Sequence, residues 1–178
     1  MKTVRNIYKD PSLRIKSVST MLPLLVLLLL APPLFADSTP SQACKNLVNL
    51  QLPDTVITFT ETVSAGSFTP PHPHTAIGNL PAFCRAAARS KPAIRFEVWL
   101  PLHKWNGKFQ GVGNGGTAGS INYHSMAVAL RRGYAVVSTD TGHVNKPAGN
   151  GFDASWALGH PELVADFGHR GLHLATVN

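Results

Sequence analysis

The stretch that most constrains the fold runs from Trp105 to Gly119, with the sequence W-N-G-K-F-Q-G-V-G-N-G-G-T-A-G. A short apolar segment, Phe109 to Val112, leads directly into a loop that contains four glycines. Glycine has no Cβ, so such a loop can adopt positive φ values and bring backbone N–H groups close to a ligand. An ordinary glycine-rich turn has the same composition. The flanking segments are therefore needed to distinguish a ligand-binding loop from such a turn.

An amphipathic helix and a buried strand are predicted after this loop. Tyr123 begins an apolar pattern that repeats at i+3, i+4 and i+7, which is one face of a helix. Ser120 is predicted to cap this helix and Gly133 to end it. Tyr134 to Thr139 (Y-A-V-V-S-T) is a near-continuous apolar run of the kind found in buried parallel strands. The order strand, loop, helix, strand predicts a right-handed βαβ unit.

The βαβ unit predicts where a site would lie. In open α/β sheets, ligands bind beyond the carboxyl ends of the strands. The glycine-rich loop and the segment Asp140-Thr141-Gly142-His143 both follow such ends, so we expect them to be neighbours. Asp140 and His143 can pair across this turn. The simpler interpretation is that Asp140 binds backbone N–H groups and His143 packs locally.

Alternating and β-branched residues predict antiparallel strands in the first half of the chain. The predicted strands are Thr55–Thr62, Phe83–Arg89 and Ile94–Leu100, and the Pro- and Gly-containing stretch Ser64–Asn79 is predicted to be a loop. A further helix is predicted to begin at Asp166. The fold class is therefore α/β, with antiparallel strands leading into a βαβ unit. We expect the strand that ends at Thr139 to be an unprotected edge.

Residues 1–36 have the pattern of an export signal. Basic residues precede the apolar run Met21–Leu30, and Ala36 offers a small residue for cleavage. A membrane anchor is the alternative, but this run is interrupted by Pro23 and is too short to cross a bilayer comfortably. We expect a secreted or periplasmic protein without a membrane contact after signal removal, with residues 37–178 forming one domain.

The net charge of +7 is concentrated in the predicted signal, which holds five basic residues and one acidic residue. The remaining chain has 11 basic and 8 acidic residues and no basic stripe interleaved with aromatic side chains. A nucleic-acid partner is therefore not expected.

Two cysteines, Cys44 and Cys84, remain in the predicted mature chain. An even pair in an oxidising compartment suggests one disulfide, and two free buried thiols are the alternative. No metal site is predicted. His72 and His74 lie on a proline-rich stretch without a third ligand, and the pair at positions 169 and 173 lacks the H-E-x-x-H pattern.

Three motifs carry a family resemblance. They are the W-N-G stretch above, R-G-Y-A-V-V-S-T-D-T-G-H and P-E-L-V-A-D-F-G-H-R-G-L-H, with F-C-R and F-E-V-W-L-P in support. The chain from Cys44 to Asn178 resembles the tannase and feruloyl esterase family, which includes mono(hydroxyethyl) terephthalate hydrolase. The resemblance implies an α/β-hydrolase fold with an inserted lid, and a serine esterase that acts on aromatic carboxylic esters such as ferulates or gallates.

The resemblance also assigns roles to residues. Gly116 aligns with the family's loop donor to the oxyanion hole, and the cysteines matching Cys44 and Cys84 form a disulfide in the family. The family nucleophile lies in a G-C-S-x-G-G motif, which these 178 residues do not contain; nor do they contain a G-x-S-x-G elbow. The family's acid, histidine and calcium-binding lid also fall beyond Asn178, so no cofactor is expected. The prediction is an incomplete α/β-hydrolase core that is catalytically inactive as it stands.

A second hypothesis is a secreted, non-catalytic module that binds aromatic acids or glycans. Trp99, Trp105 and Trp156 would then supply stacking surfaces. The alternative for all three tryptophans is packing against the core and loops.

Overall fold

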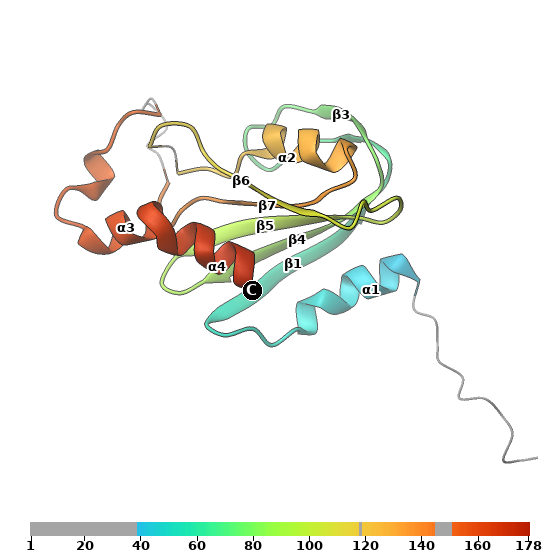
Figure 1. Ribbon diagram of the computed structural model, residues 1–178, viewed down its shortest axis with the longest axis horizontal. Helices are drawn as coiled ribbons and strands as arrows, with labels where there is room; N and C mark the ends of the chain where they lie inside the picture. The colour runs from blue at the N-terminus through green and yellow to red at the C-terminus, as the bar shows by residue number, and fades with distance from the viewer. Residues whose placement is uncertain (1–38, 118, 145–150) are drawn as a thin grey trace, which may run out of the picture. The chain divides into compact units, whose positions relative to one another are not determined.

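The computed structural model describes residues 39–117, 119–144 and 151–178, so the predicted signal at 1–36 lies outside the described residues. Five strands form one mixed sheet in the order β1-β4-β5-β7-β6 (Figure 1). Their bounds are Thr55–Val63 (β1), Phe83–Ser90 (β4), Ile94–Pro101 (β5), Phe109–Val112 (β6) and Ala135–Thr139 (β7). β1, β4, β5 and β7 pair antiparallel, whereas β6 and β7 pair parallel. The predicted α/β class, with antiparallel strands before a βαβ unit, is confirmed.

β7 lies inside the sheet, between β5 and β6. The expectation that the strand ending at Thr139 is an open edge is therefore wrong. The chain leaves β6, passes through a helix and returns into the position beside β5, so β7 has hydrogen-bonded neighbours on both sides. All five β7 residues are buried. Among the described residues, the edges of this sheet are β1 and β6.

Helix α2 (Tyr123–Arg131) covers one face of the sheet. The predicted apolar face is confirmed, because all four of its residues are buried: Tyr123, Met126, Ala127 and Leu130. Ser120 is not the cap; the side chain of Asn122 accepts a hydrogen bond from Ser125 N at 3.1 Å. Gly133 follows the helix with φ of +80°, a left-handed conformation that favours glycine at a helix end.

The opposite face of the sheet is covered by the last helical segment of the chain (Figure 1). This segment consists of α3 (Pro161–Ala165), one π-helical turn (Asp166–Arg170) and α4 (Gly171–Val177). It begins five residues earlier than predicted, with Pro161 in the first turn, where its missing N–H costs nothing. Ala175 packs on Val137, while the preceding β7 residue, Val136, faces the α2 core. Alternate residues of β7 therefore serve two cores.

A short hairpin occupies part of the region predicted to be a loop. β2 (Gly66–Phe68) pairs antiparallel with β3 (Ile77–Leu80). Phe68 is buried, and its ring lies edge-on to Trp99 with 5.4 Å between centroids. The prediction failed because tertiary contacts of Phe68 with the buried rings of Phe83 and Trp99, rather than local alternation, support these short strands.

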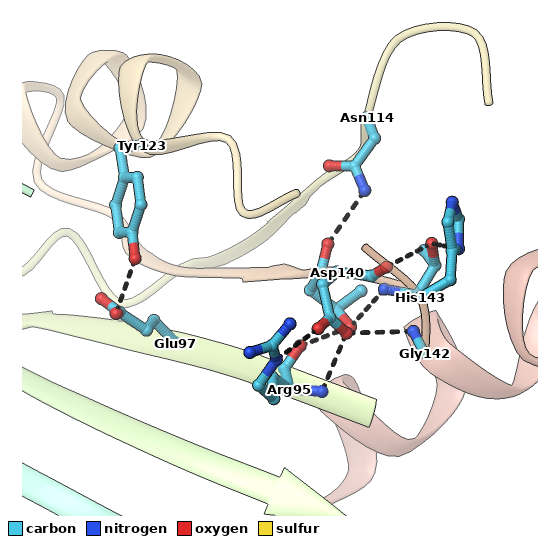
Figure 2. Close-up of polar contacts among 9 residues, drawn as sticks. Arg95, Glu97, Asn114, Tyr123, Asp140, Gly142 and His143 are labelled. Atoms are coloured by element: carbon cyan, nitrogen blue, oxygen red, sulfur yellow. Dashed lines mark hydrogen bonds and ion pairs between the residues drawn. The ribbon is translucent and has the colours of Figure 1, made fainter. Parts of the chain in front are cut away.

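The α2 side of the sheet also buries a charge. Glu97, only 3% exposed, accepts hydrogen bonds from Arg85 at 2.6 and 2.8 Å and from Trp99 Nε1 at 3.1 Å. It also accepts from Tyr123 Oη at 2.8 Å (Figure 2). Burial, together with the negative charge of Glu97, raises the pKa of Tyr123 well above its usual value. Glu97 is thus a fully satisfied polar centre within an apolar layer.

Helix α1 (Pro40–Asn46) and a 3-10 turn (Leu47–Asn49) precede β1. The predicted disulfide between Cys44 and Cys84 is present and joins α1 to β4, with 5.6 Å between the two Cα atoms. Both cysteines are buried. None of the helices in the described part of the chain is long and apolar enough to cross a membrane.

We predict that replacing both cysteines by alanine lowers the free energy of unfolding by about 4 kcal/mol, because the disulfide closes a loop between residues 40 positions apart. Urea denaturation followed by circular dichroism measures the change. The reduced wild-type protein is the control and should unfold at a similar urea concentration. A double variant as stable as the oxidised protein would contradict the prediction.

Candidate functional site

The glycine-rich loop and the turn after β7 are in direct contact, as predicted (Figure 2). Asn114 Nδ2 donates to Thr139 O at 2.9 Å, and His143 Nε2 lies 3.0 Å from Thr117 O. A Cβ on Gly119 would lie only 2.5 Å from His143, so only glycine allows this approach. The carboxyl ends of β6 and β7 therefore form one connected surface.

The turn Asp140–His143 has an uncommon backbone. Thr141 and Gly142 have φ of 55° and 84°, as in a type I′ turn, and His143 N donates to Asp140 O at 3.4 Å. A β-branched residue such as threonine rarely adopts positive φ, so surrounding contacts must hold it there. One such contact is local: Thr141 Oγ1 donates to Asp140 O at 2.7 Å.

The Asp140 carboxylate is the main contact that fixes this turn. Its Oδ1 accepts from Arg95 N at 2.9 Å and from Gly142 N at 3.0 Å, and its Oδ2 accepts from Arg95 Nε at 2.7 Å (Figure 2). The side chain is 5% exposed. The interpretation that Asp140 binds backbone N–H groups is therefore confirmed, with an arginine in addition. In the described residues, neither carboxylate oxygen of Asp140 hydrogen-bonds to the His143 ring.

His143 packs in an aromatic cluster and supports the glycine-rich loop. Its ring stacks on Trp156 with 3.8 Å between centroids and an interplanar angle of 19°, and Phe167 contacts it edge-on at 5.8 Å. A carbonyl oxygen only accepts hydrogen bonds, so the bond to Thr117 O assigns a proton to Nε2. The stack on Trp156 could not be predicted from the sequence, because nothing in the local pattern brings residues 143 and 156 together.

Gly116, the predicted oxyanion donor, lies where only glycine fits. Its φ is +57°, and a Cβ built on it would lie 2.2 Å from Gly151 O. That carbonyl accepts from Thr117 N at 2.6 Å and from Thr117 Oγ1 at 3.0 Å. Within the described residues, the Gly116 N–H has no acceptor. The loop thus already holds one carbonyl oxygen and retains an unbonded N–H beside it.

Other candidate residues do not join this site. Trp99 is buried in the core, Trp156 packs on His143, and Trp105 is 59% exposed with its Nε1 donating to Lys108 O. The rings of His72 and His74 lie 6.4 Å apart on the surface. In the described ranges, no group of three His, Cys, Asp or Glu side chains could hold a metal ion, and no serine hydroxyl hydrogen-bonds to a histidine.

The fold and the site together define an α/β protein with a glycine-rich loop at the carboxyl end of a parallel strand. Residues 75–178 match the family model described as tannase and feruloyl esterase. This match covers more than half of the sequence, and the chain belongs to the tannase and feruloyl esterase family.

Relatives and solved structures agree with this assignment. An uncharacterized esterase of Xanthomonas campestris is 44% identical over 149 residues, covering 82% of this chain and 25% of that protein. A probable feruloyl esterase B-2 of Neosartorya fischeri is 32% identical over 170 residues, covering 89% of this chain and 31% of that protein. The crystal structure of feruloyl esterase B from Aspergillus oryzae superposes with a TM-score of 0.68 at 28% identity, covering 78% of this chain and 28% of that one. The chain thus spans a quarter to a third of these proteins.

We predict that Asp140→Asn lowers the free energy of unfolding by about 2–3 kcal/mol, because the amide nitrogen that replaces one carboxylate oxygen cannot accept a hydrogen bond and leaves at least one N–H donor of Arg95 or Gly142 without its buried acceptor. Asp54→Asn is the matched control. Asp54 also pairs with a cation, Lys91, but both side chains are largely exposed, so its loss should cost less than about 1 kcal/mol. Equal effects of the two substitutions in urea denaturation would refute the role given to Asp140.

Proposed function

We propose that this chain supplies the oxyanion loop of a secreted serine esterase that hydrolyses aromatic carboxylic esters such as ferulates or gallates. The observation that carries the proposal is the N–H of Gly116, which has no acceptor in the described part of the chain and lies on a loop whose Thr117 N–H binds the Gly151 carbonyl. A loop that accepts a carbonyl oxygen has the geometry to accept the oxygen of an ester as it becomes negatively charged.

The substrate class rests on family membership and on the names of relatives. The Neosartorya protein is named a probable feruloyl esterase, and the Aspergillus oryzae structure is of a feruloyl esterase. Secretion rests on the sequence pattern of residues 1–36. The single disulfide between Cys44 and Cys84 is consistent with an oxidising compartment.

We also propose that the 178 residues are inactive by themselves. They contain no G-x-S-x-G or G-C-S-x-G-G sequence to hold a nucleophile. An oxyanion loop contributes only part of an enzyme's rate enhancement, and removing the nucleophile removes most of it. The non-catalytic alternative depended on exposed tryptophans, of which Trp105 alone is largely exposed in the described residues.

The purified protein is expected to show no measurable turnover of methyl ferulate or methyl gallate, because hydrolysis requires a nucleophile that these residues do not provide. Product formation is followed by chromatography over several hours. A relative that hydrolyses methyl ferulate serves as the positive control. Robust turnover that a serine-directed reagent abolishes would refute this part of the proposal.

The role of the loop is tested in a chimera in which residues 75–178 replace the aligned segment of the Xanthomonas campestris esterase. If the parent hydrolyses methyl ferulate, the chimera should as well, and Gly116→Ala should lower its kcat by about 100-fold or more. Alanine at 116 would collide with Gly151 O and displace the N–H donor.

Gly115→Ala is the matched control in the same chimera. A Cβ at position 115 meets no atom within 4 Å, so kcat should remain close to that of the parent chimera. A Gly116→Ala chimera that is folded and fully active would show that the donor lies elsewhere.

A further inference from the structure

Two arginines lie directly opposite each other on neighbouring strands of the sheet. Arg89 on β4 pairs with Arg95 on β5, and both side chains are exposed. Like charges in directly opposite positions destabilise a sheet unless something of opposite charge lies between or beside them. If the two guanidinium groups lack anionic partners within the protein, the pair is suited to bind an anion from solution.

Only one of the two arginines has a carboxylate partner. Asp140 binds the Nε of Arg95 at 2.7 Å and its backbone N–H at 2.9 Å, which fixes the guanidinium against β7 (Figure 2). The terminal nitrogens of Arg95 make no hydrogen bond within the described residues. The guanidinium group of Arg89 makes no hydrogen bond, ion pair or ring contact in the same part of the chain. The two arginines thus share a hollow with one carboxylate, and most of their N–H donors have no partner within the described residues.

The surface beside these arginines is hollowed. Two hollows of about 330 and 430 Å³ both include Arg89 and Arg95 in their walls. Pro71 and Ile121 add apolar surface to the larger one, and Val144 borders both. Ligand sites of small molecules commonly have such volumes and combine an apolar wall with a few convergent polar groups.

The other titratable groups around the hollows offset the charge of Arg95 but not the charge of Arg89. Asp140 is already shared between Arg95 and the Gly142 N–H, and Glu97 is held by Arg85. His72 lies in the wall of the larger hollow and His143 in the wall of the smaller one. The local balance near Arg89 therefore favours a monoanion.

We propose that Arg89 and Arg95 form a binding site for a small aromatic carboxylate. A planar carboxylate matches the fork of a guanidinium group, and charge-assisted pairs of this kind are both strong and directional. Asp140 holds Arg95 in place before the ligand arrives, which reduces the ordering required on binding. The apolar wall accommodates the ring of the ligand. Gly119 of the glycine-rich loop borders the larger hollow, but Gly116 borders neither, and the existence of this site does not depend on ester hydrolysis.

The test is a titration of the purified protein with sodium benzoate at constant ionic strength, monitored by the NMR signals of the arginine Nε–H groups. We expect saturable shifts at Arg89 and Arg95, with a dissociation constant on the order of 1 mM or lower. Benzamide, which has the same shape without the charge, should produce no saturable shift. An equal response to benzamide, or no saturation by benzoate, would overturn the proposal.

Substitutions distinguish binding of benzoate at this site from non-specific attraction of an anion to a basic protein. Arg89→Gln should weaken benzoate binding by about tenfold, as expected when a charge-assisted hydrogen bond is lost. Arg89→Lys keeps the charge without the planar fork, so its affinity for benzoate should lie between those of the wild type and Arg89→Gln. Arg132→Gln removes the same charge from a different exposed arginine, which stacks over Tyr134, and should bind like the wild type. Unchanged binding by Arg89→Gln, or inorganic phosphate displacing benzoate at lower concentration, would refute a carboxylate site.

Discussion

The buried carboxylate of Asp140 is the contact on which the arrangement around the glycine-rich loop depends. It connects the end of β7 to the start of β5, and it fixes the turn that carries His143. That turn requires a threonine at positive φ, so it needs contacts strong enough to offset the strain. Because this turn positions His143, which hydrogen-bonds to Thr117 O, the Asp140 carboxylate also influences the backbone of the glycine-rich loop. A polar interaction thus sets the geometry of the turn, and the aromatic packing of His143 on Trp156 and Phe167 adds to it.

Sequence patterns predicted those elements whose signal is local. The strand at Ile94 and the helical face beginning at Tyr123 each carry a clear period, and both are present. The pattern could not predict the burial of Glu97, because that depends on α2 covering the second face of the sheet. Nor could it place β7 between β5 and β6, since strand order follows from where the crossover returns.

The candidate site was predicted in part. The βαβ unit predicted that the glycine-rich loop and the D-T-G-H turn lie side by side. The choice of Gly116 as the oxyanion donor came from the family resemblance and stays a prediction. The stack of His143 on Trp156 and the pairing of Arg89 with Arg95 did not follow from local spacing. Both are tertiary contacts between segments whose separation in the sequence has no characteristic value. Reading such contacts requires the register of the strands and the path of the chain after β7.

The carbonyl of Gly151 has a consequence for any ligand of the loop. It occupies the Thr117 N–H and lies against Gly116, so the chain itself competes for one N–H of the loop, although the Gly116 N–H has no acceptor within the described residues. An intramolecular competitor is always present at a high effective concentration. For a ligand that requires the Thr117 N–H, the observed affinity is therefore its intrinsic affinity multiplied by the fraction of molecules in which that N–H is free.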